Sequence, residues 1–455
     1  MSTRPAPVIA WWVIGAAVLA AVGVVIWHIT AMPITNPFYG IFHNYTDLRV
    51  YRAGAQTVLD SDPLYRRPVL WGLDWTYPPF AAIILVPFAL VSQQVANVIW
   101  WAATFLALIA TIVLSFRSLG YRIDARLWVF SVLLAICSTA LEPVRTTIWL
   151  GQINVFLMLL VLADLVLLDM IRPDSRLRGF GVGVAAGIKL TPAFFVVYLI
   201  TLRQWRAVAT AVAGFAATVL IGFAVIPHDA WQYWTHDVVG DSTRIGRVDS
   251  PANQSINGFL SQMLAYFDIR RFAHPAPGAP VFEAPTWLWV PIALIAAVLG
   301  VWAAVVAHRR GRELLAVTII GMTASTISPF SWGHHWVWVV PLFVVAFDAA
   351  YRDASLRTWW RWLGPAAIVT LTFTWWHHWY DSGPHLTSDH AIALGLFMMP
   401  RWPDPQWYER LVVVIYAGCY PLVLLLTIIV TLVAGRLSPC HSGRGSESGL
   451  AGDGT

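Results

Sequence analysis

The chain has 455 residues, of which 58% are apolar and only 12% are charged, and its mean hydropathy is +0.65. A soluble domain averages about 45–50% apolar and about 25% charged residues, and a single hydrophobic core stops growing near about 250–300 residues. The composition therefore excludes one large soluble domain and predicts a polytopic membrane protein.

The charged residues are distributed unevenly. Lys and Arg together number 29, but Lys189 is the only lysine, and arginines in the polar segments between apolar runs produce the net charge of +5. This placement does not form a nucleic-acid-binding patch, so we expect membrane lipids and no nucleic acid as partners. Three scattered cysteines, Cys137, Cys419 and Cys440, fit neither a disulfide framework nor a metal site.

Apolar runs occur along most of the chain. A bilayer core of about 30 Å needs about 20 apolar residues per helix. Runs that approach this length cover residues 8–30, 95–116, 127–140, 153–171, 179–200, 208–226, 286–307, 314–327, 337–350, 364–379 and 408–434. The sequence therefore predicts an all-α membrane protein with about 10–12 transmembrane helices.

Two apolar segments are irregular. Residues 80–91 are short and interrupted by Pro87, which predicts a half-helix or a re-entrant segment. Residues 179–200 carry Lys189 and Pro192 in their middle, so they form either one span or a broken hairpin.

Arginine placement predicts the sidedness of the chain through the positive-inside rule. The basic positions are Arg4, Arg117, Arg122, Arg126, Arg172, Arg176, Arg178, Arg203, Arg206, Arg309, Arg310, Arg312, Arg352, Arg357, Arg361 and the tail from Arg436. If all of them are cytoplasmic, both termini lie inside and residues 179–200 enter and leave on the same side.

The long polar segments 31–78, 227–285 and 381–406 then face outward. Loops of this length tend to be functional, so we expect the chemistry of the protein on this face. Residues 1–434 form one predicted membrane domain, and residues 435–455, rich in Gly and Ser, are expected to be a disordered cytoplasmic tail.

The first outer segment contains a short amphipathic helix pattern. Thr46 is a candidate N-cap, and Leu48, Tyr51, Ala55 and Val58/Leu59 fall on one helical face. Asp47 would lie in the first turn, close to the hydrocarbon boundary, where ionisable groups usually have a function. A carboxylate that only complements the helix dipole is the alternative interpretation.

Lys189 is the second unusual residue, because a lysine beside a proline break at membrane depth usually pairs with an anion or extends to the interface. The tip of a broken hairpin with one ammonium group would suit a lipid phosphate. Arg145 lies at the outer entrance of a predicted helix and could serve the same anion or pair with Glu142.

His334 and His335 follow a kinked segment at a predicted outer helix end. Neighbouring helical residues point about 100° apart, so the two rings cannot ligate one metal ion, and we expect no metal site. The rings could donate to a phosphate or a sugar hydroxyl, or belong to an aromatic belt. In the second outer segment, Asn253 and Gln254 accompany aromatic residues in a composition typical of sugar-binding clefts.

Several motifs together resemble glycosyltransferase family 87, actinobacterial enzymes with the GT-C fold that use polyprenyl-phosphate sugars. The resemblance covers residues 8 to about 434. Its motifs are Asp47-Leu-Arg-Val-Tyr-Arg-Ala-Gly-Ala, Pro63-Leu-Tyr65, Thr76-Tyr-Pro-Pro-Phe80, Gly151-Gln-Ile-Asn154, Ala186-Gly-Ile-Lys-Leu-Thr-Pro192, Asn253-Gln-Ser-Ile-Asn-Gly258 and residues 331–336.

The resemblance implies an inverting α-1,2-mannosyltransferase that uses polyprenyl-phosphate-mannose and a mannosyl glycolipid acceptor, a phosphatidylinositol mannoside or lipomannan. It places the active site on the extracytoplasmic face of the plasma membrane, with Asp47 as general base and with no metal or other cofactor. The substrate contacts that we expect are Tyr51, Arg52, Arg145, Lys189, Asn253, Gln254, His334 and His335.

Two other functions remain open at this point. A polyprenyl-phosphate-arabinose-dependent arabinofuranosyltransferase would share the motifs around Asp47 and Tyr51. A transporter or flippase of lipid-linked sugars would belong to a different class, and such proteins usually have two related halves, which this sequence does not show.

Overall fold

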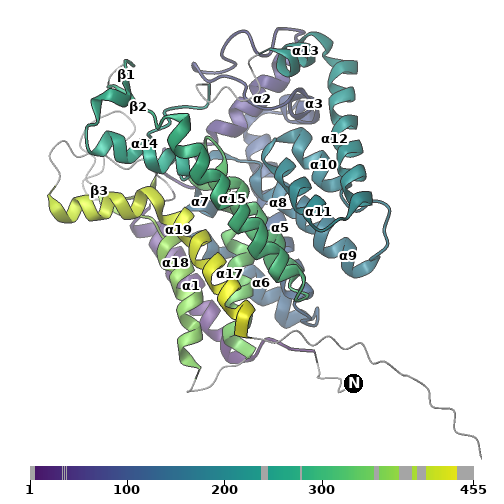
Figure 1. Ribbon diagram of the computed structural model, residues 1–455, viewed down its shortest axis with the longest axis vertical. Helices are drawn as coiled ribbons and strands as arrows, with labels where there is room; N and C mark the ends of the chain where they lie inside the picture. Colours follow the sequence, from purple (N-terminus) through teal and green to yellow (C-terminus); the bar gives the residue numbers. More distant parts are fainter. Residues whose placement is uncertain are drawn as a thin grey trace, which may run out of the picture.

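The computed structural model describes residues 6–32, 34, 36, 38–236, 244–276, 279–352, 358–378, 392–396 and 406–437. These residues form a helical bundle with two small antiparallel sheets, as the composition predicts (Figure 1). One sheet pairs β1 (Ala273–His274) with β2 (Val281–Phe282), and the other pairs β3 (Trp376–His378) with β4 (Ile392–Leu394). Most of the predicted outer segment 381–406 and nearly all of the predicted tail 435–455 lie outside the described residues.

Seven helical segments in the described residues are long and apolar enough to cross a membrane. They are α1 (Trp11–Thr30), α5 (Gln93–Ser118), Asn154–Ile171, α12 (Trp205–Val225), α15 (Thr286–His308), Gly333–Arg352 and α19 (Trp407–Leu437). The number becomes eight if α6 (Ala125–Ser138) and α7 (Glu142–Leu150), which bend by 83°, count as one span. The protein is therefore a multi-pass membrane protein.

Two of these segments combine different helix types. Residues Asn154–Ile171 comprise α8 (Asn154–Leu162), a π-helical turn (Ala163–Leu167) and α9 (Leu168–Ile171). Residues Gly333–Arg352 comprise a 3₁₀ turn (Gly333–Trp336) and α17 (Val339–Arg352).

Fewer described helices reach full spanning length than the sequence predicts. α16 (Glu313–Ile327) and α18 (Leu363–Thr372) occupy predicted runs but have 15 and 10 residues. α16 is buried along nearly its whole length, and Ser328 leaves the helical conformation because it precedes Pro329. Apolar composition therefore identifies these helices without indicating where each one ends.

The two irregular segments fold as interrupted helices. Residues 80–91 fall mainly in α3 (Pro79–Ile84) and α4 (Val86–Ala89), too short to cross a membrane. Residues 179–200 form α10 (Phe180–Ile188), an extended break at Lys189, a 3₁₀ turn (Thr191–Ala193) and α11 (Phe194–Thr201).

α10 and α11 form the broken hairpin rather than one span. Arg178, just before α10, lies 3.4 Å from the Glu313 carboxylate, and the Tyr198 hydroxyl of α11 donates to the same carboxylate at 3.2 Å. Both ends of the hairpin therefore meet at one side of the bundle. The nine residues of α10 rise by about 14 Å, about half of a bilayer core, and carry Lys189 to the hairpin tip.

Arginine-bearing loops gather at one end of the bundle. Arg352 donates to the Leu119 carbonyl, and Arg310 donates to the Ala434 carbonyl at 2.9 Å. The opposite end carries α2 (Thr46–Leu59), α13 (Pro227–Thr235) and α14 (Ile256–Tyr266), which Figure 1 shows together at the top. The bundle thus has one basic end and one end built from the long polar segments.

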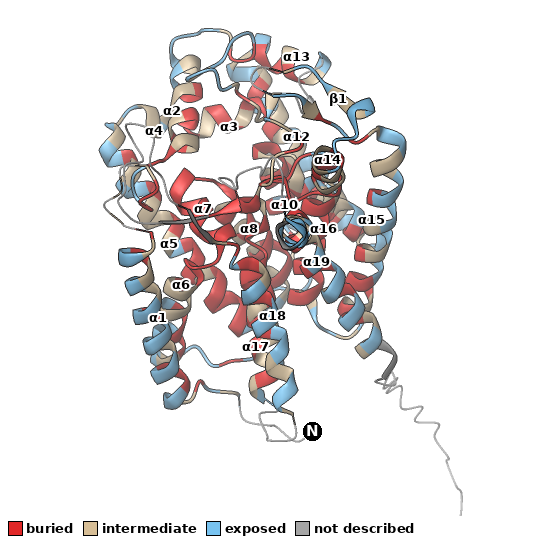
Figure 2. Cartoon of the chain, turned by 90° about the vertical axis from the view of Figure 1, so that its left-hand side faces the viewer, coloured by how far each residue is buried: buried red, intermediate tan, exposed pale blue. Residues whose placement is uncertain are grey.

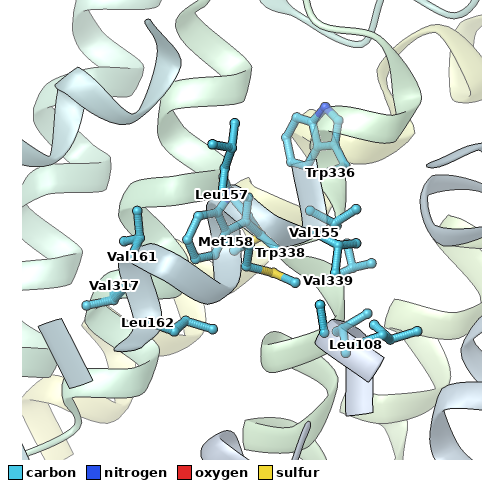
Figure 3. Packing of buried hydrophobic residues seen from close by; sticks show 14 of the residues in the cluster. Leu108, Val155, Leu157, Met158, Val161, Leu162, Val317, Trp336, Trp338 and Val339 are labelled. Atoms are coloured by element: carbon cyan, nitrogen blue, oxygen red, sulfur yellow. The ribbon is translucent and has the colours of Figure 1, made fainter. Parts of the chain in front are cut away.

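Buried side chains concentrate around α8 at the centre of the bundle. Figure 3 shows Val155, Leu157, Met158, Val161 and Leu162 of α8 in a larger buried cluster, together with Leu108, Val317, Trp336, Trp338 and Val339. Figure 2 shows the exposed residues on the outward surfaces of peripheral helices such as α1 and α15, where large apolar side chains are frequent. Apolar side chains thus lie both in the core and on the outward surface, as expected where lipid surrounds the protein.

Small residues bring α10 close to α12. A Cβ atom added to Gly183 would collide with the backbone carbonyl of Ala211, and one added to Gly187 would collide with the Thr218 side chain. Such glycines allow close helix approach in membranes, where van der Waals packing holds helices together. The hairpin that carries Lys189 therefore depends on this contact.

We predict opposite effects for the same substitution at two helical glycines. Gly183→Ala forces the added methyl group against rigid backbone and should destabilise the protein by about 1–3 kcal/mol. Gly15→Ala in α1, where nothing lies within 4 Å of the added atom, should be neutral or stabilising by up to about 1 kcal/mol. Thermal unfolding of the purified variants in detergent measures both, and equal midpoints would contradict the proposed packing.

Candidate functional site

The start of α2 places Asp47 at the outer end of the bundle. The helix begins at Thr46, so its N-cap is Tyr45 and not the predicted Thr46. The Asn44 side chain accepts the Thr46 backbone N–H at 2.9 Å. The Tyr45 N–H donates to the Trp149 carbonyl at 2.8 Å. Of the predicted apolar face, Leu48, Tyr51 and Ala55 are buried, Val58 is half-buried and Leu59 is exposed. The amphipathic helix is therefore confirmed over its first three turns, and its cap is shifted.

Gly151 brings the end of α7 against the start of α2. It adopts the left-handed conformation at φ 72°, and a Cβ atom there would collide with Leu48. The next residue, Gln152, donates from Nε2 to Asp47 Oδ2 at 2.5 Å. Gln152 Oε1 accepts from the Tyr51 hydroxyl at 2.9 Å, which fixes the amide with its donor toward Asp47.

The environment of Asp47 favours a carboxyl group that ionises near neutrality. Burial raises the pKa of the Asp47 carboxyl to about 6, against the hydrogen bond from Gln152 and the positive charge of Lys189, which lower it. A carboxylate with a pKa close to the working pH is suited to accept a proton from a hydroxyl group.

Lys189 lies at the hairpin tip on the same side of the bundle as Asp47. Its Nζ donates to Asn154 Oδ1 at 2.9 Å, lies 2.9 Å from His335 Nε2, and stands 5.6 Å from the centre of the Tyr77 ring. Since an ammonium group only donates, His335 Nε2 accepts in this contact and its ring proton is on Nδ1. The lysine therefore has polar and aromatic neighbours but no carboxylate at hydrogen-bond distance among the described residues.

The two adjacent histidines have different surroundings. His335 is hydrogen-bonded to Lys189. His334 is only 2% exposed, its ring lies nearly parallel to that of Trp332, and neither ring nitrogen has a hydrogen-bond partner among the described residues. His334 is thus the histidine whose ring nitrogens lack a hydrogen-bond partner in the described chain.

A cavity of about 500 Å³ connects these groups, and we call it the outer cavity. Its volume is typical of small-molecule sites. Its walls include Asp47, Gln152, Lys189, His334, His335, Tyr77, Trp149, Arg244, Phe330 and Trp332. Arg244 lies 3.5 Å from Asp74 and donates to the Tyr65 carbonyl at 3.1 Å.

Gln152 and Arg244 line the outer cavity but were not selected as site residues from the sequence. Gln152 falls in the Gly151–Asn154 motif, and Arg244 belongs to the polar second outer segment, so a motif-based signal existed for Gln152. Their roles depend on the fold, because Gln152 meets Asp47 across 105 positions of sequence.

Arg145 does not line the outer cavity. It is buried between the Trp149 and Trp375 rings, 5.7 Å from each ring centre, and donates to the Tyr39 carbonyl. Glu142 accepts from the hydroxyl groups of Thr146 and Tyr420. The structure therefore gives Arg145 a packing position rather than the expected substrate contact.

Arg52 and Tyr51, both expected to contact substrate, do not line the outer cavity. Arg52 points away from the outer cavity and donates to the Phe88 carbonyl at 2.7 Å and to Gln93 Oε1 at 2.6 Å. Tyr51 is buried behind Asp47, with its hydroxyl 3.1 Å from that of Tyr77. Tyr51 thus positions Gln152 without lining the cavity.

Asn253 and Gln254 hydrogen-bond to Ser331, three residues before His334. Asn253 Oδ1 accepts the Ser331 N–H at 2.9 Å, and the Gln254 N–H donates to the Ser331 carbonyl at 2.7 Å. Both side chains are fully buried and absent from the cavity wall. The side-chain amide of Asn253 accepts from the Ser331 backbone, and that of Gln254 donates to the Tyr416 carbonyl at 2.8 Å, so both side chains satisfy backbone groups instead of facing the outer cavity.

A carboxylate, an ammonium group and an unpartnered imidazole around one cavity are the groups that activate a hydroxyl and stabilise a departing anion. No group of three or more His, Cys, Asp or Glu side chains is arranged to hold a metal ion in the part of the chain that the structure describes. Fold and site together therefore define a membrane-embedded group-transfer enzyme.

Comparison with known proteins identifies the family. The model of glycosyltransferase family 87 matches residues 75–329. Two similar proteins of Mycobacterium tuberculosis are polyprenol-phosphate-mannose-dependent α-(1-2)-mannosyltransferases, one named for phosphatidylinositol mannoside and one for phosphatidylinositol pentamannoside. They are 33% and 34% identical over 72% and 70% of this chain, and over 75% and 70% of their own lengths.

A phosphatidylinositol mannoside mannosyltransferase of Mycolicibacterium smegmatis is 33% identical over 81% of this chain and 82% of its own length. No solved structure matches the chain significantly. The chain belongs to glycosyltransferase family 87 and is a membrane glycosyltransferase, as its motifs predict.

We predict that sugar transfer requires the ionised form of Asp47. Since the pKa of this carboxyl is raised to about 6, kcat/KM should fall about tenfold per pH unit below 6. Gln152→Leu removes a hydrogen bond that lowers this pKa, so the acid limb should move to higher pH. Gln232→Leu, outside the cavity wall, is the matched control, and identical pH profiles of all three proteins would contradict the assignment.

Proposed function

We propose that the protein transfers mannose from polyprenyl-phosphate-mannose to a hydroxyl group of a phosphatidylinositol mannoside or lipomannan, and forms an α-1,2 linkage. The observation that carries this proposal is Asp47, a partly buried carboxylate oriented by Gln152 in a cavity that also holds Lys189. The shared donor in the names of the relatives supports mannose over arabinose.

The reaction is a single displacement with inversion. Asp47 accepts the proton of the acceptor hydroxyl, whose oxygen forms a bond to the anomeric carbon of mannose. The bond between that carbon and the phosphate oxygen breaks, and polyprenyl phosphate leaves with the electron pair. Lys189 and His334 donate to the phosphate, which supplies the electrostatic stabilisation that most assists such a step.

The geometry of the outer cavity supports these assignments. The hydrogen bond from Gln152 occupies Asp47 Oδ2, so Oδ1 remains for the acceptor hydroxyl. Asn154 and His335 hold the Lys189 ammonium in place without neutralising its charge. The phosphate therefore meets a cation that is positioned before the donor binds, which lowers the cost of reorganisation.

We also propose that the outer cavity opens to the extracytoplasmic side of the plasma membrane. The arginine-bearing loops lie at the other end of the bundle, where Arg310 contacts the last turns of α19 and Arg352 contacts the residue after α5. Cytoplasmic loops carry an excess of arginine and lysine. The donor and the acceptor, both lipids, then reach the cavity from the outer leaflet.

Two substitutions separate chemistry from donor binding. Asp47→Asn should lower kcat about 10²- to 10⁴-fold, the usual contribution of a general base, with little change in donor affinity. Lys189→Met keeps the apolar stem but removes the charge, and should weaken donor binding about 10- to 100-fold, as expected for a hydrogen bond to a charged group. Product analysis by mass spectrometry and a direct donor-binding assay measure the two effects.

The control for charge is Asp62→Asn, which removes an exposed carboxylate paired with Arg67 and should behave as the unmodified protein. Turnover by Asp47→Asn at the unmodified rate would refute the mechanism. Unchanged donor affinity in Lys189→Met would show that Lys189 does not bind the donor phosphate.

We propose that transfer needs no metal or other cofactor, because the leaving phosphate is already an anion and Lys189 supplies positive charge beside it. Incubation with EDTA should leave the rate of mannose transfer unchanged within about twofold, the scatter of such assays. A loss of activity on chelation that Mg²⁺ or Mn²⁺ restores would contradict this prediction. The same assay on Lys189→Met checks that added cations do not replace the ammonium group.

A further inference from the structure

A second cavity, of about 460 Å³, lies on the side of α2 away from Asp47. We call it the rear cavity. Its lining residues are Arg49, Arg52, Ala53, Gln56, Leu70, Trp71, Ala89 and Gln93. Arg49 and Arg52 follow Asp47 by two and five positions, which turns them by about 200° and 140° around a helix with about 3.6 residues per turn.

The arginines of the rear cavity have no carboxylate partner among the described residues. Arg52 donates to the carbonyls of Phe88 and Val91 and to the Gln93 amide, all of which are neutral acceptors. Arg49 stands 5.4 Å from the centre of the Trp71 ring, and its buried Nε has no hydrogen-bond partner in the described chain. Two neighbouring positive charges therefore share one cavity without compensation, an arrangement that favours an anion.

The surroundings of the rear cavity point to a lipid ligand. Trp71 is 67% exposed at a tight turn in which it adopts a positive φ of 50° and Gly72 one of 81°. Leu90, directly after α4, is 70% exposed. Exposed tryptophan is typical of the membrane–water interface, so the cavity opens where lipid headgroups lie.

We propose that the rear cavity binds the phosphodiester of an anionic glycerophospholipid, either the acceptor glycolipid or a neighbouring lipid. A guanidinium group offers five N–H donors, and three of the donors of Arg52 are used by the protein, which leaves donors of both arginines for phosphate oxygens. Trp71 would cover the glycerol region beside Arg49.

The assignment of the acceptor glycolipid as the ligand of the rear cavity rests on the proposed function. In that case α2, about 10–12 Å across, separates the phosphate of the acceptor from Asp47. A headgroup with several sugars can extend around this helix from the rear cavity to the outer cavity. The rear cavity would then select acceptors whose reacting sugar stands at a set distance from the phosphate.

The test measures lipid binding without the donor. Full-length protein in a neutral detergent is titrated with dioctanoyl phosphatidylinositol, a phosphatidylinositol mannoside, dioctanoyl phosphatidylglycerol and uncharged dioctanoylglycerol. Arg49→Gln should weaken binding of the phosphate-containing ligand about 10- to 100-fold, the range for a hydrogen bond to a charged group. Dioctanoylglycerol should not discriminate between the proteins.

Arg67→Gln is the matched control, since it removes an exposed arginine of the same polar segment that pairs with Asp62. It should bind all four lipids as the unmodified protein does. Arg49→Lys should restore part of the affinity, because it keeps the charge but not the planar fork. Unchanged unfolding midpoints confirm that Arg49→Gln is folded.

The outcomes separate the two sources of phosphate. Arg49-dependent binding of the inositol lipids alone identifies the acceptor as occupant, and equal dependence for phosphatidylglycerol identifies any anionic lipid. Equal affinity of Arg49→Gln and the unmodified protein for every phosphate-containing lipid would overturn the proposal. Arg49-dependent binding in a protein that transfers no mannose would overturn only the proposed function, because the binding assay contains no donor.

Discussion

The hydrogen bond from Gln152 to Asp47 is the interaction on which the outer cavity depends. A carboxylate taken out of water needs a polar partner, and Gln152 supplies it while its own carbonyl accepts from Tyr51. Asn154, two residues later, accepts from Lys189. The four-residue segment Gly151–Asn154, which begins at the left-handed Gly151, therefore fixes the position of the Asp47 carboxylate relative to the Lys189 ammonium group.

The hairpin that carries Lys189 is anchored far from the cavity. At its base, Glu313 accepts from Tyr198 and meets Arg178, while the Asp164 carboxylate accepts the backbone N–H groups of Gly179 and Val182. These contacts satisfy the exposed donors at the start of α10, which lipid could not do. Polar residues inside apolar segments thus hold the one lysine at a defined height.

Much of this arrangement is predictable from the sequence, because it depends on local patterns. Helical periodicity identified α2 and placed Asp47 in its first turn, and Pro192 beside Lys189 indicated the break in the hairpin. Long-range contacts have no such signal. Asn253 and Gln254 look like ligands for a sugar by composition, and only the fold shows that their side-chain amides satisfy backbone groups of Ser331 and Tyr416. Arg145 is likewise enclosed by Trp149 and Trp375, which lie 226 positions apart in sequence and meet only in the bundle.

Arg52 shows how one motif can serve two sites. The spacing between Asp47 and Arg52 places them on different sides of α2. The motif that begins at Asp47 therefore contributes residues to both the outer and the rear cavity. The helix is then a partition with a carboxylate on one side and two uncompensated arginines on the other. Both sides carry positive charge, but only the outer side combines its cation Lys189 with a carboxylate, so an anionic headgroup held by Arg49 and Arg52 leaves Asp47 available to the acceptor hydroxyl.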